Sequence, residues 1–114
     1  MQAPRVDGPR RKPSVVKREI RFSIRAEEDL DFISAFTGER FGPVQEQKYG
    51  EGLFRAFQML LTFPNLGTDQ SEAGEGLRRT VHERHAIYYS VHPFGILIER
   101  ILGPGLDPAR EFEP

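Results

Sequence analysis

The residues whose side chains are best suited to binding or catalysis lie between positions 78 and 88. Arg78 and Arg79 carry planar guanidinium groups, whose paired N–H donors suit contacts with phosphate or carboxylate groups. His85 is a candidate general base, and Tyr88 is a candidate for stacking on a base or on a partner's side chain. Together these side chains indicate contact with a nucleic acid or a protein target, with acid–base catalysis as the alternative.

The histidines of this region do not indicate a metal site. His82 and His85 stand on either side of a predicted turn, and no carboxylate lies at a recognisable ligand spacing from them. Acid–base chemistry with Glu83 is the other use of such a pair. We therefore expect neither a metal ion nor a cofactor.

Each charged candidate also has a structural interpretation. Arg78 and Arg79 are adjacent, so in a strand they point to opposite faces of the sheet, and an edge pair of this kind deters aggregation. Arg100 lies among apolar residues, and we expect either an ion pair with Glu99 or Glu83 or a contact with the target beside the tail.

Three short strands must position these side chains. Alternating patterns predict strands over 77–83, 85–92 and 96–102, with Pro93-Phe94-Gly95 as the second turn. In the middle strand, Ile87, Tyr89 and Val91 share one face, while Tyr88 and Ser90 share the other. Tyr89 is expected in the core, beneath helices.

Two helices are predicted before these strands. A strand over 16–22 leads to Ser23, a typical N-cap, and an apolar stripe predicts a helix from about 24 to 41. Gly42-Pro43 ends that helix and begins a second one over 43–63. Gly50 and Gly52 indicate either close packing or a bend in the second helix. The predicted fold is α+β: an N-terminal strand, an antiparallel helical hairpin and a three-stranded antiparallel meander.

Charge divides the chain. Residues 1–18 carry six cations and one acid, a net charge of +5, which leaves −6 on the rest of a chain whose net charge is −1. We expect a flexible basic arm over 1–16, one domain over 17–106 and a C-terminal tail over 107–114. No cysteine is present, and no apolar run reaches the roughly 18–20 residues that span a bilayer, so we expect a cytoplasmic protein that is not membrane-bound.

Residues along almost the whole chain carry a resemblance to a known family. They fall in the first helix and its turn, in the second helix and its exit, in the meander and in the tail: Ala26, Asp29, Leu30, Ile33, Arg40, Phe41, Gly42, Leu53, Phe57, Leu60, Pro64, Gly67, Leu77, Arg78, Arg79, Ile87, Tyr89, Val91, Ile96, Ile98, Arg100, Ile101, Leu102, Asp107 and Pro108. Their order resembles the ParE branch of the RelE/ParE toxin superfamily of bacterial toxin–antitoxin systems. The resemblance spans about residues 18–110.

The resemblance implies one of two toxic activities. RelE-like members cut messenger RNA on the ribosome, whereas ParE-like members bind DNA gyrase and trap cleaved DNA without being enzymes. This chain departs from the nuclease pattern, since it has Ala86 where many nucleases have arginine, and it ends in Glu113-Pro114 instead of a His-Tyr pair or an aromatic residue. The ParE-like activity is therefore favoured. Gly103, where many ParE-like members have histidine, favours a third alternative, a non-toxic domain that only binds an antitoxin.

The resemblance also assigns candidate partners and contact residues. The partners are DNA gyrase and a ParD-like antitoxin, expected to be a ribbon-helix-helix protein, in a toxin–antitoxin hetero-oligomer. The candidates for target contact are Arg78, Arg79, Tyr88, Arg100 and Asp107, and those for antitoxin contact are Phe32, Phe36, Phe57 and Tyr88. The nuclease alternative uses Arg78, Arg79, His85 and Tyr88.

Overall fold

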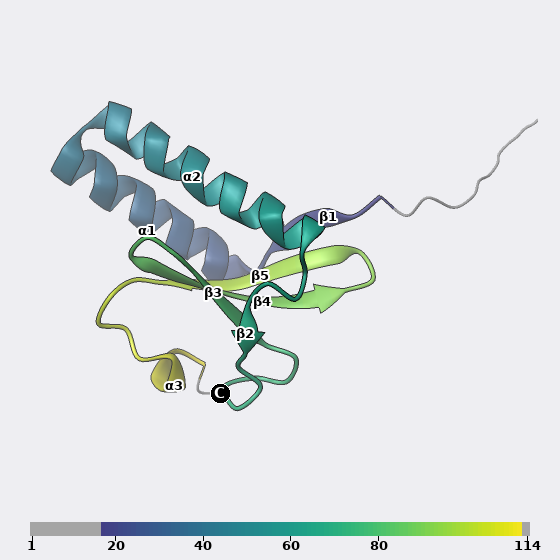
Figure 1. Ribbon diagram of the computed structural model, residues 1–114. Helices are drawn as coiled ribbons and strands as arrows, with labels where there is room; N and C mark the ends of the chain where they lie inside the picture. The colour runs from purple at the N-terminus through teal and green to yellow at the C-terminus, as the bar shows by residue number, and fades with distance from the viewer. Residues whose placement is uncertain (1–16, 113–114) are drawn as a thin grey trace, which may run out of the picture.

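The computed structural model describes residues 17–112, and the predicted basic arm lies outside them. The described part has five strands and three helices (Figure 1). In chain order they are β1 (Glu19–Phe22), α1 (Ile24–Phe41), α2 (Pro43–Thr62), β2 (Thr68–Asp69), β3 (Arg78–His82), β4 (His85–His92), β5 (Gly95–Leu102) and α3 (Pro108–Glu111). None of the helices in this part is long and apolar enough to cross a membrane.

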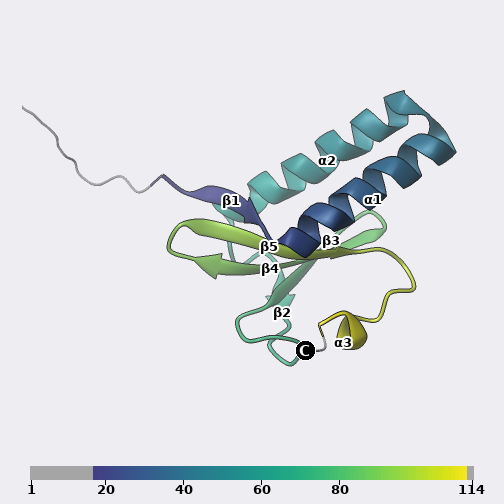
Figure 2. The same cartoon turned by 180° about the vertical axis from the view of Figure 1, so that it is seen from behind.

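The strands form one mixed sheet in the order β1-β5-β4-β3-β2. The predicted meander is present, because β3, β4 and β5 pair antiparallel with their neighbours. β1 lies parallel to β5, so the N-terminal strand extends the meander at one edge, and the short β2, which was not predicted, extends it at the other. The hairpin α1–α2 lies along one face of the sheet, and α3 lies toward the other (Figures 1 and 2).

The helical hairpin begins and turns where its sequence indicates. Ser23 caps α1, since its hydroxyl accepts a hydrogen bond from the Ala26 N–H at 3.0 Å. Gly42 ends α1 at φ +91°, a conformation that favours glycine, and Pro43 takes the first turn of α2. α2 runs without interruption through Gly50 and Gly52. A Cβ on Gly52 would lie 3.0 Å from His82 Nε2, so this glycine permits close packing, whereas Gly50 faces open space.

Apolar residues pack on both faces of the sheet. The larger cluster lies between the hairpin and the sheet, and its buried members are Ala26, Ile33, Leu53, Phe57, Leu60, Ile87, Tyr89, Ile96, Ile98 and Ile101. The smaller cluster joins Leu77, Tyr88 and Leu102, with Phe112 after α3 packed against them. The predicted alternation of β4 is therefore correct at Ile87, Tyr89 and Tyr88, and the core contains Tyr89 as expected.

A β-bulge marks the centre of β5. Tyr88 pairs with Arg100, whereas Tyr89 pairs with Ile98, so Glu99 is an extra residue on β5. β1 stops pairing at this level, with Phe22 opposite Ile98, because Ser23 starts α1. Beyond this point the edge of β5 is covered by Asp29 of α1, whose carboxylate accepts a hydrogen bond from the Ile101 N–H at 2.8 Å.

Candidate functional site

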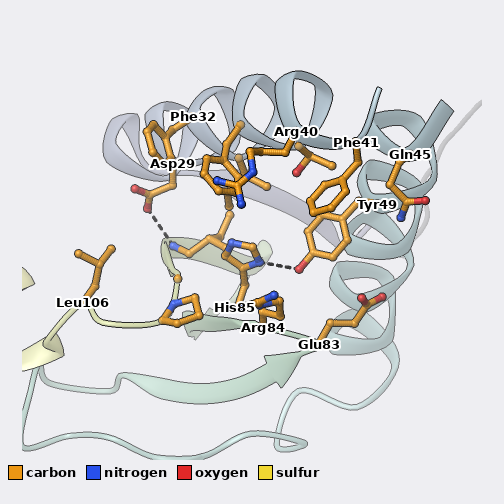
Figure 3. Close-up of a pocket in the computed structure, with 16 residues that line it drawn as sticks. Asp29, Phe32, Arg40, Phe41, Gln45, Tyr49, Glu83, Arg84, His85 and Leu106 are labelled. Carbon is orange, nitrogen blue, oxygen red and sulfur yellow. Dashed lines mark hydrogen bonds between the residues drawn. The ribbon is translucent and has the colours of Figure 1, made fainter. Parts of the chain in front are cut away.

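A large hollow lies between the helical hairpin and one end of the sheet. We call it the hairpin groove. It has a volume of about 1040 Å³ and is lined by Asp29, Phe32, Ile33, Phe36, Thr37, Arg40, Phe41, Gln45, Tyr49, Glu83, Arg84, His85, Ile101, Gly103, Pro104 and Leu106 (Figure 3). Four segments thus contribute to it: α1, α2, the β3–β4 turn and the end of β5 with the residues that follow.

One wall is a ladder of side chains on α1. Phe32, Phe36 and Arg40 are four residues apart and therefore stand on one face of the helix. The two rings stack with centroids 6.1 Å apart, and the Arg40 guanidinium lies 5.3 Å from the centre of the Phe36 ring. The Phe32 side chain is 70% exposed and that of Phe36 45%. An apolar surface of this kind on a helix is typical of a contact with another protein.

The opposite wall is formed by Tyr49 of α2 and His85 of β4. The Tyr49 hydroxyl lies 2.5 Å from His85 Nδ1 and 3.3 Å from the His82 carbonyl oxygen. Burial, with the nearby charge of Glu83, raises the pKa of Tyr49 to about 12. Burial, with the charges of His82 and Arg84, lowers the pKa of His85 below 6.5. Both groups are therefore neutral at pH 7, and their hydrogen bond fastens the β3–β4 turn to the hairpin.

The turn between β3 and β4 has only two residues, and neither of them is a glycine. His82 pairs with His85, so only Glu83 and Arg84 connect β3 to β4. Glu83 has φ +52°, and it is the one non-glycine residue between 17 and 112 with a positive φ. The turn places Glu83 and Arg84 at the rim of the hairpin groove.

Chemically, the hairpin groove suits binding. Its wall is aromatic, its rim carries Arg40 and Arg84 against the acid Glu83, and its close acid–base pair, Tyr49 and His85, is neutral. Among the described residues, no group of three or more histidine, cysteine, aspartate or glutamate side chains is placed to hold a metal ion. A segment with an apolar face and acidic residues matches this surface.

The structure separates the two neighbouring arginines, as their adjacent positions in a strand predict. Arg78 pairs with Tyr89 on the face toward the hairpin, and its guanidinium donates to the carbonyl oxygens of Asn65 and Gly67. It thus holds the loop after α2 and is not free for a target. Arg79 pairs with Tyr88 on the other face and is half-buried, and its side chain has no hydrogen bond or ion pair to any residue between 17 and 112.

Two predicted contact residues prove to be buried. Tyr88 is 2% exposed and its ring lies 5.2 Å from that of Phe112, so it is a core residue and not a surface for stacking on a base or an antitoxin. Arg100 is 6% exposed and forms ion pairs with Asp29 and Glu111, which corrects both the expected contact with a target and the expected partners Glu99 and Glu83. The structural interpretation of Arg100 as a paired residue is confirmed.

Of the remaining candidate contact residues, one is buried and the others are at least partly exposed. Phe57 is 3% exposed and packs edge to face on Phe22 with centroids 5.4 Å apart, so the expectation that it meets an antitoxin is wrong. Phe32 and Phe36 lie exposed in the hairpin groove, as does His85 in part. Asp107 is exposed and caps α3, accepting a hydrogen bond from the Ala109 N–H at 3.0 Å.

Part of the groove was not predicted. Tyr49, Arg40 and Arg84 are not among the contact residues expected from the sequence. For α1 a signal was present, because position 40 continues the spacing of Phe32 and Phe36. For Tyr49 there was none, since its neighbour His85 is 36 residues away in the chain.

Comparisons with known proteins agree with this fold. Residues 20–103 match the family model described as the ParE toxin of the type II toxin–antitoxin system parDE. A curated relative, Toxin ParE1 of Caulobacter vibrioides, is 31% identical over 81 residues, which are 71% of this chain and 81% of the relative. A solved chain from the chromosomal ParDE TA system of P. aeruginosa has a TM-score of 0.65 and 22% identity, covering 78% of this chain and 98% of its own. The chain therefore belongs to the ParE toxin family of type II toxin–antitoxin systems.

Proposed function

We propose that this chain inhibits DNA gyrase by binding to it and trapping cleaved DNA, without catalysing a reaction itself. The observation that carries the proposal is where the fold places the side chains that a nuclease would use. Of Arg78, Arg79, His85 and Tyr88, two are engaged inside the fold, because Tyr88 is buried and Arg78 holds a loop. Arg79 and His85 remain, and the His85 Nδ1 is already bound to Tyr49. The loss of two of the four candidates supports the non-catalytic alternative over the ribosome-dependent nuclease.

We further propose that a ParD-like antitoxin neutralises the chain by placing an amphipathic helix in the hairpin groove. Phe32 and Phe36 supply exposed apolar anchors, and Arg40 and Arg84 supply positive charge at the rim. A helix that carries apolar residues on one face and acidic residues at its edges complements both features. The relatives support a partner of this kind, since the solved chain comes from a ParDE system.

A supercoiling assay tests the action on gyrase. Purified chain is incubated with gyrase, ATP and relaxed plasmid, and the products are separated on a gel. We expect supercoiling to stop or linear DNA to accumulate, and we expect the antitoxin to reverse either effect. Unchanged supercoiling at a large molar excess of folded chain would contradict the proposal and favour the non-toxic, antitoxin-binding alternative.

A second measurement addresses the nuclease alternative. Transcript ends are mapped on ribosomes before and after the chain is expressed. We expect the ends to be unchanged, because the buried Tyr88 and the tethered Arg78 cannot reach an RNA backbone. New ends at ribosome-bound positions would instead support RelE-type cleavage.

A further inference from the structure

A second hollow lies on the face of the sheet that the hairpin does not cover. Residues 103–106 connect β5 to α3, and we call them the strap. Between the strap and strands β3 and β4 is a hollow of about 380 Å³, which we call the strap hollow. Its polar side chains come from Gln70, Arg79, Arg84, His85 and Tyr88. The aromatic ladder of the hairpin groove does not line this hollow, but five residues border both hollows: Arg84, His85, Gly103, Pro104 and Leu106.

The only charged side chains that line the strap hollow are two arginines. Its lining contains Arg79 and Arg84 and no aspartate or glutamate, and the other lining residues are uncharged or, like His85, neutral at pH 7. Within the described residues, neither Arg79 nor Arg84 has an ion-pair partner. Two guanidinium groups that share one hollow without a counter-charge are an anion-binding arrangement.

His85 brings a third polar group to the same hollow. Its Nδ1 lies 2.5 Å from the Tyr49 hydroxyl, which also donates to the His82 carbonyl oxygen at 3.3 Å. The other ring nitrogen, Nε2, lies toward Gly103, where an added Cβ would be 3.6 Å away, so the glycine leaves this nitrogen open to the strap.

We infer that the strap hollow binds a phosphate of a nucleic-acid backbone, held by Arg79 and Arg84 with His85 beside them. We favour a phosphodiester over an acidic peptide because the Tyr88 ring of this hollow is buried against Phe112 and offers no exposed aromatic anchor to a protein partner. The inference adds a direct contact with DNA to the proposed action on gyrase. It is tested without gyrase, so that the failure of one idea is distinct from the failure of the other.

The test measures binding of fluorescently labelled oligonucleotides to the full-length chain by anisotropy. Single-stranded DNA, duplex DNA and RNA of equal length are compared at about 50 and 200 mM salt. The variants Arg79→Gln and Arg84→Gln are compared with Arg55→Gln, which removes an exposed charge from α2 outside the strap hollow. This control accounts for general electrostatic attraction, including that of the cations before residue 17.

We expect Arg79→Gln and Arg84→Gln each to weaken binding roughly three- to tenfold more than Arg55→Gln does. We also expect the slope of log K against log salt to fall by about 0.7–0.9 for each lost phosphate contact. Equal weakening by all three variants would overturn the inference, because general charge alone would then explain the binding.

A second measurement does not depend on affinity for a long polyanion. The side-chain Nε–H signals of Arg79 and Arg84 are followed by NMR while inorganic phosphate or acetate is added to the full-length chain. Shifts that saturate with phosphate and are smaller with acetate support the site. Shifts that are larger with acetate overturn it in favour of a carboxylate from a protein partner.

Discussion

Arg100 on β5 and Asp29 on α1 form a two-bond ion pair, with Arg100 Nε 2.8 Å and Nη2 2.9 Å from the two carboxylate oxygens. A third nitrogen, Nη1, lies 2.9 Å from the Glu111 carboxylate of α3. One buried arginine at the edge of the sheet thus joins the helical hairpin on one face to α3 on the other. The hydrogen bond to Asp29 raises the pKa of Arg100 above its ordinary value, although burial acts in the opposite direction.

Removing Asp29 is expected to destabilise the fold strongly. Asp29→Ala leaves the Arg100 guanidinium, whose side chain is 8% exposed, with only Glu111, and it leaves the Ile101 N–H without its acceptor. We expect this substitution to lower the free energy of unfolding, measured by urea denaturation, by about 3–5 kcal/mol. Asp29→Asn keeps an oxygen acceptor for Ile101 and is expected to recover part of this loss.

The matched control is Glu19→Ala, which breaks the exposed pair between Glu19 and Arg21. An exposed pair contributes at most about 1 kcal/mol. If Asp29→Ala costs no more than this control, the buried pair does not hold the layers together.

The order of the elements could be predicted because its signals are local. Ser23, Gly42 and Pro43 act on residues next to them in the chain, so they predict where the helices begin and end. As a result, α1 and α2 lie within one residue of their expected bounds. The parallel pairing of β1 with β5 and the bulge at Glu99 depend on residues far apart in the chain, for which a single sequence carries no signal.

The site residues were harder to predict for the same reason. Tyr88 occupies the outward face of β4, as its position indicates, yet it is buried because Phe112 packs over it from beyond α3. Arg100 finds Asp29 across 71 residues of sequence, whereas the expected partners were its near neighbours in the predicted sheet. Exposure of a side chain on a small sheet thus depends on what the tail covers.

The two glycines of α2 provide a paired test of packing. Gly50 faces open space, so Gly50→Ala is expected to raise the free energy of unfolding by about 0.5–1 kcal/mol through its better helix propensity. Gly52→Ala gains the same propensity, but its Cβ would lie 3.0 Å from His82 Nε2, so we expect a smaller gain or a loss. Thermal unfolding of both variants checks this, and equal gains would contradict close packing at Gly52.

Stability is expected to fall in mildly acidic solution because of His85. The unfolded chain protonates this histidine near pH 6.5, whereas the folded chain, in which burial lowers the pKa, keeps it neutral. The unfolded state therefore binds more protons between the two pKa values, and the free energy of unfolding decreases as the pH falls through that window. Urea midpoints at about pH 7.5 and 5.5 measure the decrease. Both pH values lie above the ordinary pKa range of carboxyl groups, so the carboxyl groups contribute little to the difference.

The control for this effect is His85→Gln, which keeps a polar side chain but removes the titrating ring. We expect the variant to lose less stability than the parent chain over the same pH range. An equal loss in both proteins would show that another group causes it.

The hairpin groove yields a prediction about the proposed antitoxin complex. Phe32→Ala and Phe36→Ala remove exposed rings, so we expect little change in the stability of the free chain. Each is expected to weaken the binding of the antitoxin by about 1–3 kcal/mol, roughly 5- to 150-fold, because aromatic anchors dominate such interfaces. Phe54→Ala is the control, since this ring is 58% exposed on α2 and does not line the groove. Titration calorimetry with the purified antitoxin distinguishes the two sites, and a loss of affinity in Phe54→Ala as large as in Phe32→Ala would place the antitoxin elsewhere on the hairpin.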